Sequence, residues 1–69
     1  MSVTYKKLWK LLIDKNMKKK ELASKAHLTQ YALNKLTRDE NVTTEILGRI
    51  CDALDCSVED IIEFYPDKE

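Results

Sequence analysis

The chain has 69 residues, and twelve lysines and arginines balance twelve aspartates and glutamates, so the formal net charge is zero. This length fits one small domain, residues 1–69 with a frayed tail at 66–69, and a domain of this size is marginally stable alone, which favours a dimer. One glycine and one proline exclude a loop-rich or disordered chain, and the absence of a long apolar run or signal peptide predicts a cytoplasmic protein without a membrane span.

The zero net charge hides a split along the chain. Residues 1–38 hold ten basic and two acidic residues, for a charge of +8, whereas residues 39–69 hold two basic and ten acidic residues, for −8. A basic half of this kind is typical of a surface that contacts nucleic acid, although a solvated surface of mixed charge would give the same count.

No constellation in the sequence indicates catalysis. The chain has a single histidine, His27, no glycine-rich phosphate loop and no paired carboxylates in a plausible pocket, so we expect no enzyme activity, no catalytic residue and no cofactor. Cys51 and Cys56 with one histidine do not make a zinc site, so no metal is expected. We interpret both cysteines as small core residues rather than as a redox pair.

In chain order, the first predicted helix runs from Ser2 or Thr4 to Asn16, with Trp9 part of the core. The second opens at Lys18, Lys19 and Lys20, and Glu21 can accept from an upstream amide as half of a capping box. Three lysines at a helix N-terminus favour contact with phosphate, through the free amides and the positive charge, over a merely solvated face.

The segment from Leu22 to Leu36 predicts two short helices joined by a tight turn. Leu22, Ala23 and Ala26 make one narrow apolar stripe, and Ala32, Leu33 and Leu36 repeat the same spacing. Thr29 between them is a good N-cap. The outer face of the second of these helices carries polar or amphipathic side chains, none of them acidic: Gln30, Tyr31, Asn34, Lys35 and Arg38.

This stretch resembles the helix-turn-helix of the Cro and phage-repressor (XRE-type) family, and the resemblance covers about Leu8 to Phe64. It implies an all-α fold, a compact five-helix bundle of the lambda-repressor-like type, and a sequence-specific DNA-binding regulator that acts as a repressor on double-stranded DNA. The family usually has glycine where this chain has His27, because that turn residue often needs a positive φ.

The docking mode of the family places the helix 29–37 in the major groove. It implies base contacts by Thr29, Gln30, Tyr31 and Lys35, and the residue types fit: glutamine pairs with adenine, lysine with guanine, and tyrosine packs on a thymine methyl. Partial packing of Tyr31 in the core is the alternative. The expected phosphate contacts are Lys18, Lys19, Lys20, Asn34, Arg38, Asn41 and Thr43, although Asp39 and Glu40 weaken the match of their loop to the family.

Two further helices are predicted. Thr43 or Thr44 caps the fourth, which runs through Ile46 to Leu54 and contains Gly48, at a cost of about 1 kcal/mol relative to alanine. The fifth runs from Val58 to about Phe64, and Ser57 with Asp60 three residues later resembles a capping box at its start. Phe64 and Tyr65 add more apolar surface than one short helix needs, so we expect them in a homodimer interface.

Two alternative functions keep the same fold. In one, the protein is an antitoxin whose protein partner binds the acidic half. In the other, it is a protein-interaction module that no longer binds DNA. The one hint in that direction is the acidic pair Asp39 and Glu40, next to the helix predicted to read DNA.

Overall fold

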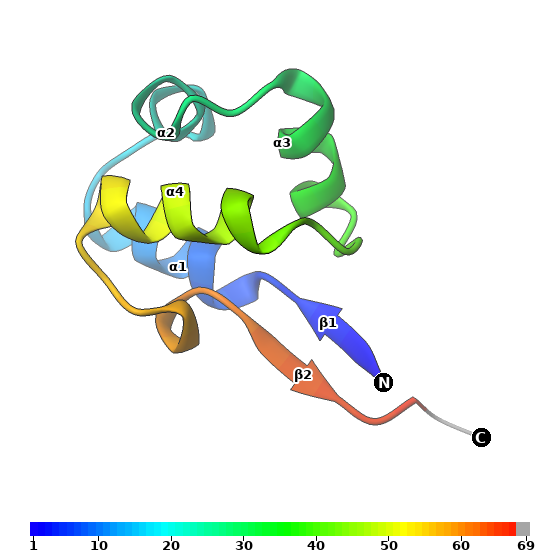
Figure 1. Cartoon of the computed structure of the whole chain (residues 1–69). Coiled ribbons are helices and arrows are strands. Elements are labelled where there is room, and N and C mark those ends of the chain that lie inside the picture. The colour runs from blue at the N-terminus through cyan, green and yellow to red at the C-terminus, as the bar shows by residue number, and fades with distance from the viewer. Residues whose placement is uncertain (68–69) are drawn as a thin grey trace.

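The computed structural model describes residues 1–67. Four helices form the body of the molecule and a pair of short strands projects from it (Figure 1). In chain order the elements are β1 (Ser2–Thr4), α1 (Lys6–Asp14), α2 (Lys19–Ala26), α3 (Gln30–Thr37), α4 (Thr44–Leu54), a 3₁₀ turn η1 (Val58–Asp60) and β2 (Glu63–Tyr65). The prediction of an all-α, five-helix bundle is therefore wrong in the number of helices and in the absence of strands, although the fold is mostly helical.

The predicted fifth helix, Val58 to Phe64, does not form. Only η1 is helical, and it begins with the expected capping box, in which the Ser57 N–H donates to the Asp60 carboxylate at 3.0 Å. The chain then extends, and Glu63–Tyr65 pairs antiparallel with Ser2–Thr4. Aromatic and β-branched residues suit a strand, and β1 supplies the backbone hydrogen-bonding partner that a local pattern cannot reveal.

The same pairing moves the start of the first helix. Helix α1 begins at Lys6 rather than at Ser2 or Thr4, because those residues belong to β1. Asp39 lies at this N-terminus, where its Oδ1 accepts from the Tyr5 N–H at 3.0 Å and from the Thr4 hydroxyl at 3.4 Å. A carboxylate at the start of a helix satisfies a free amide and favours the helix dipole.

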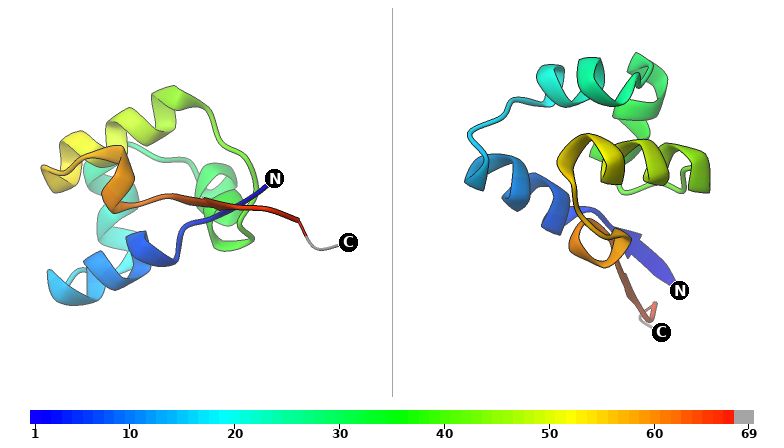
Figure 2. Two further views of the ribbon diagram at one scale, coloured as in Figure 1. Left: turned by 90° about the horizontal axis from the view of Figure 1, so that it is seen from below. Right: turned by 60° about the vertical axis from the view of Figure 1, so that its left-hand side comes forward.

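The core lies where α1, α2, α3 and α4 meet. Helix α2 packs on both α3 and α4, and η1 packs on α1 and α4. Figure 2 shows α2 and α3 as one layer over α4 and α1. Trp9 is partly buried against the core, as expected, and so is Met17, whereas Ile13 is exposed. The buried apolar cluster consists of Val3, Tyr5, Leu8, Leu12, Leu22, Ala26, Leu36, Ile50, Leu54 and Ile61.

Residues with a left-handed backbone follow all four helices, and none of them is glycine. They are Asn16, His27, Asp39 and Asp55, with φ between 53° and 57°. Gly48, in contrast, lies inside α4, and apart from its chain neighbours and the backbone of its own helix no atom is within 4 Å of the position that a Cβ would take. Within residues 1–67, therefore, no other segment packs so closely against Gly48 that a glycine is required there.

The expected frayed tail, 66–69, falls partly on residues 68 and 69, which lie outside the described residues. Asp67 is described, and its carboxylate accepts from the Met1 amino group at 2.8 Å and from the Ser2 hydroxyl. The contact with the Met1 amino group is the larger cause and the contact with the Ser2 hydroxyl the smaller, and both lower the pKa of Asp67.

Candidate nucleic-acid interface

The turn between α2 and α3 has the geometry that the sequence pattern predicts. His27 ends α2 with φ 57° and ψ 47°, so it adopts the left-handed conformation at the position where the family usually has glycine. The Leu28 N–H donates to the Ala23 carbonyl at 2.8 Å. Thr29 then caps α3, because its hydroxyl oxygen accepts from the Ala32 N–H at 3.1 Å.

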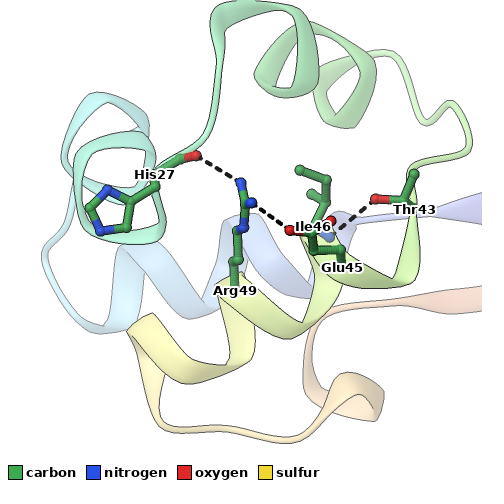
Figure 3. A network of polar contacts seen from close by, with 5 residues as sticks. All are labelled: His27, Thr43, Glu45, Ile46 and Arg49. Atoms are coloured by element: carbon green, nitrogen blue, oxygen red, sulfur yellow. Dashed lines mark hydrogen bonds and ion pairs between the residues drawn. The ribbon is translucent and has the colours of Figure 1, made fainter.

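Arg49 connects this turn to α4 (Figure 3). Its Nη1 donates to the His27 carbonyl at 3.2 Å, and its Nη2 donates to Glu45 Oε2 at 2.6 Å. The guanidinium thus holds the end of α2 against α4. This contact was not predicted from the sequence. The i, i+4 spacing of Glu45 and Arg49 is a local signal for their ion pair, but nothing local points to a carbonyl 22 residues earlier.

The outer face of α3 presents the predicted base-reading side chains. Tyr31 is 71% exposed, which excludes its packing in the core. Gln30 Nε2 donates to Asn34 Oδ1 at 2.9 Å, one turn further along the helix. Lys35 Nζ lies 5.3 Å from the centre of the Tyr31 ring and 3.5 Å from the Asn41 carbonyl oxygen. These contacts orient polar side chains on a face without an acidic residue.

A groove of about 470 Å³ runs between α3 and the segment that leads into α4. It brings together five of the predicted site residues, namely Thr29, Tyr31, Lys35, Asn41 and Thr43. Three apolar residues complete its lining, namely Ala32, Val42 and Ile46, and none of them was predicted from the sequence as a site residue. Thr43 also caps α4, since its hydroxyl oxygen accepts from the Ile46 N–H at 3.2 Å.

The acidic loop after α3 is attached to α1. Asp39 accepts hydrogen bonds at the start of α1, and the Glu40 carbonyl accepts from the Tyr5 hydroxyl at 2.7 Å. Burial raises the pKa of Tyr5, and the nearby Asp39 carboxylate raises it further. The Glu40 carboxylate lies 3.8 Å from Arg38 Nη1 in an exposed ion pair. The Asp39 carboxylate is therefore explained by its hydrogen bonds at the start of α1. Its presence next to α3 is no argument against DNA binding.

The three lysines lie at the N-terminus of α2 and do not line the groove. Lys18 N donates to Glu21 Oε1 at 3.1 Å, which is the half capping box that the sequence predicts. Lys19 Nζ lies 4.4 Å above the centre of the Trp9 ring, a distance suited to a cation–π contact. Lys20 is exposed. Asn34 and Arg38 also lie outside the groove lining.

The two cysteines are free and partly buried against the core. Burial raises the pKa of Cys56 to about 11, and the neighbouring Cys51 contributes in the same direction. Within residues 1–67, no group of three or more histidine, cysteine or acidic side chains is placed to hold a metal ion. No helix in this part of the chain is long and apolar enough to cross a membrane.

Comparison with known proteins gives two results. The sequence profile of the Cro/C1-type HTH DNA-binding domain matches residues 7–67. The crystal structure of the transcriptional regulator VanUg superposes on the chain with a TM-score of 0.92, at 45% sequence identity, over 96% of this chain and 88% of that chain. No curated protein sequence matches. The chain therefore belongs to the family of Cro/C1-type helix-turn-helix DNA-binding domains.

Proposed function

We propose that the protein is a sequence-specific transcription regulator that inserts α3 into the major groove and acts as a repressor. The observation that carries this proposal is the outer face of α3, where Gln30, Tyr31 and Lys35 are available and no side chain is acidic. A small domain bound across a promoter excludes other proteins from the same DNA, which supports repression. VanUg is described as a transcriptional regulator, which supports a role in transcription regulation for this chain.

Sequence is read from the first turns of α3. Gln30 offers the donor and acceptor that pair bidentately with adenine, and Lys35 donates to guanine. Tyr31 presents its ring beside them, and Thr29 stands at the start of the helix. Because Gln30 and Asn34 are hydrogen-bonded in the free protein, the Gln30 amide is already oriented before DNA arrives.

Affinity comes from phosphate contacts on both sides of α3. At the N-terminus of α2, Lys18, Lys19 and Lys20 add positive charge to free amides. The remaining proposed phosphate contacts are Asn34, Arg38, Asn41 and Thr43, which lie along α3 and in the segment that follows it. Such contacts fix the position of the protein on the duplex without reading sequence.

We also propose that the protein binds DNA as a homodimer through the strand pair. Phe64 is 62% exposed and Tyr65 is 45% exposed, and both belong to β2. A second copy would cover these rings and add a second recognition helix. Two helices related by a two-fold axis read an inverted repeat whose half-sites are about 10 base pairs apart, or a multiple of that spacing.

The test is selection of bound duplexes from a randomised DNA library at low and at moderate salt. An enriched inverted repeat is the expected result. Gln30→Ala should relax the preference at one position per half-site, with a loss of about 1–3 kcal/mol against the preferred base. Lys20→Ala should weaken binding to all sequences alike and lower the salt slope by about one.

Lys7→Ala is the matched control for Lys20→Ala. It removes the same charge from a lysine whose Nζ donates to the Glu59 carbonyl at 3.3 Å, against η1. Its salt slope should stay close to that of the unaltered protein. Retention of DNA without enrichment would reject sequence-specific reading by Gln30, and no retention at low salt would reject DNA binding altogether.

A further inference from the structure

Asp39 lies between the two surfaces that the proposed function uses, the DNA-reading face of α3 and the strand pair. It belongs to the loop 38–43 that follows α3, and its backbone is left-handed with φ 57°. The Asp39 N–H donates to the Leu36 carbonyl at 3.2 Å, and the Glu40 N–H donates to the Lys35 carbonyl at 2.9 Å. The start of the loop is therefore fixed to the end of α3.

The side chain of Asp39 connects this loop to the strand pair. Its Oδ1 accepts from the Tyr5 N–H at 3.0 Å and from the Thr4 hydroxyl at 3.4 Å. In the opposite direction, the Tyr5 hydroxyl donates to the Glu40 carbonyl at 2.7 Å. Thr4 is the last residue of β1 and pairs with Glu63 of β2. Three hydrogen bonds therefore join the loop after α3 to the end of β1.

These hydrogen bonds suit a rigid connection. A carboxylate that accepts from a backbone N–H makes a stronger bond than a neutral acceptor does. Tyr5 is 1% exposed and Thr4 is also buried, so both partners of the Asp39 carboxylate are held by the core. Helix α3 itself packs on α2, and the two strands pack on each other. The contacts of Asp39 and Tyr5 thus hold together two regions whose main packing partners lie elsewhere.

The geometry of a dimer gives this connection a consequence for DNA. In a dimer formed through the strand pair, the distance and the rotation between the two α3 helices depend on how each α3 is held against its own strands. One base pair inserted between the half-sites moves them apart by about 3.4 Å and rotates one relative to the other by about 35°. A rigid connection accepts one spacing, whereas a flexible connection accepts several.

We propose that Asp39 is a positioning residue that, together with the Tyr5 hydroxyl, fixes α3 relative to the strand pair and so determines the half-site spacing that the dimer accepts. This inference rests on the proposed function, because it requires a dimer formed through β2 that reads an inverted repeat. It goes further, since it assigns the choice of spacing to a residue outside both the proposed DNA contacts and the proposed dimer contacts.

The measurement is the spacing penalty, defined as the dissociation constant for the selected duplex with one base pair inserted between its half-sites, divided by that for the selected duplex. For the unaltered protein we expect a penalty of at least about tenfold, because the second α3 no longer reaches its half-site. Asp39→Gly removes the carboxylate and leaves a residue that favours a left-handed backbone. Its penalty should be at least about threefold smaller, since a less firmly held α3 adjusts to either spacing.

Asp55→Gly is the matched control. Asp55 also has a left-handed backbone, with φ 53°, and it lies at the end of α4 that Figure 1 shows away from the strand pair. This variant should keep the full penalty. Asp39→Asn is the conservative variant, because its amide oxygen still accepts from the Tyr5 N–H and asparagine tolerates this backbone, so it should keep most of the penalty.

Tyr5→Phe provides a second, independent variant. It removes only the hydroxyl that donates to the Glu40 carbonyl and keeps the buried ring, so it should also lower the penalty, by less than Asp39→Gly does. Thermal unfolding checks that each variant is folded, and sedimentation equilibrium checks that it is still a dimer.

The possible outcomes separate the inference from the proposed function. If Asp39→Gly weakens binding to both duplexes equally, with the penalty unchanged, its role is merely structural and the inference is overturned. An equal fall in penalty for Asp55→Gly, or an unaltered protein without a penalty, would also overturn it. If Asp39→Gly does not fold, a full penalty in Tyr5→Phe overturns it. Failure to bind any duplex, or binding as a monomer, would instead reject the proposed function and the inference with it.

Discussion

The helix-turn-helix, α2 with α3, and the strand pair use their apolar residues in opposite ways. Leu22 and Leu36 of the helix-turn-helix are fully buried, and the outer face of α3 is polar and free of acids. In the strand pair, Val3 is buried, but Phe64 and Tyr65 remain exposed on β2. The first region presents a surface suited to phosphates and base edges, and the second leaves apolar area suited to another protein surface.

Truncation of a leucine in the first region should have the largest effect. Leu36→Ala removes a side chain of α3 that is fully buried, so we expect the free energy of unfolding to fall by about 2–5 kcal/mol. A loss of this size leaves a small domain largely unfolded. Urea denaturation followed by circular dichroism measures it. Phe64→Ala at low protein concentration is the comparison, and a loss as large as that of Leu36→Ala would contradict the contrast between the two regions.

Self-association should depend on the strand pair. Phe64→Ser removes an exposed ring from the proposed interface, and we expect the dissociation constant of the dimer to rise at least about tenfold. Sedimentation equilibrium over a range of concentrations measures the change. Ile13→Ser is the matched control, because Ile13 on α1 is 76% exposed and outside the strand pair. If Ile13→Ser dissociates the dimer and Phe64→Ser does not, the interface lies on α1.

A smaller gain in stability is expected within the helical region. Gly48 is an internal residue of α4 with open space around the position of a Cβ, so Gly48→Ala should raise the free energy of unfolding by about 1 kcal/mol. Thermal or urea unfolding measures the change. A loss of stability would mean that another surface, such as a second copy of the chain, approaches α4 closely at this point.

The smallest expected effect concerns the reactivity of the Cys56 thiol, and Cys56 lies between the helix-turn-helix and the strand pair in the sequence. Burial raises the pKa of Cys56 from 9.0 to about 11, so the thiol is neutral in the folded protein at physiological pH. The stability that follows from this shift is complete below pH 9.0 and is lost as the pH rises through about 11. Alkylation of Cys56 by iodoacetamide, followed by mass spectrometry, should therefore accelerate about tenfold per pH unit up to that pKa. Rapid alkylation at neutral pH, as fast as in urea, would contradict the shift.

The helix-turn-helix could be predicted because its signals are local. The apolar spacing of Leu22 to Ala26 and of Ala32 to Leu36, and the cap at Thr29, depend on residues within one or two turns. The positive φ at His27 was expected at that turn and is confirmed. The candidate site was predicted as a set of polar residues on α3, and its specific contacts with bases and phosphates remain predictions.

The strand pair could not be predicted in the same way. Ile61, Phe64 and Tyr65 are compatible with a short helix or with a strand, and Ser57 with Asp60 suggests a helical start in either case. The choice depends on Ser2–Thr4, which lies at the opposite end of the chain and offers unpaired backbone groups. A local pattern contains no information about that partner.

The sequence by itself determined the four helices and the polar face of α3, because helix formation and amphipathic spacing act over a few residues. Only the tertiary structure decided the strand pair, the Asp39 carboxylate at the start of α1, the Arg49 contact with the helix-turn-helix turn and the apolar lining of the groove. Each of these joins segments that are distant in the chain. Their formation follows from the packing of the whole domain, which brings together donors, acceptors and apolar surfaces that are not neighbours in sequence.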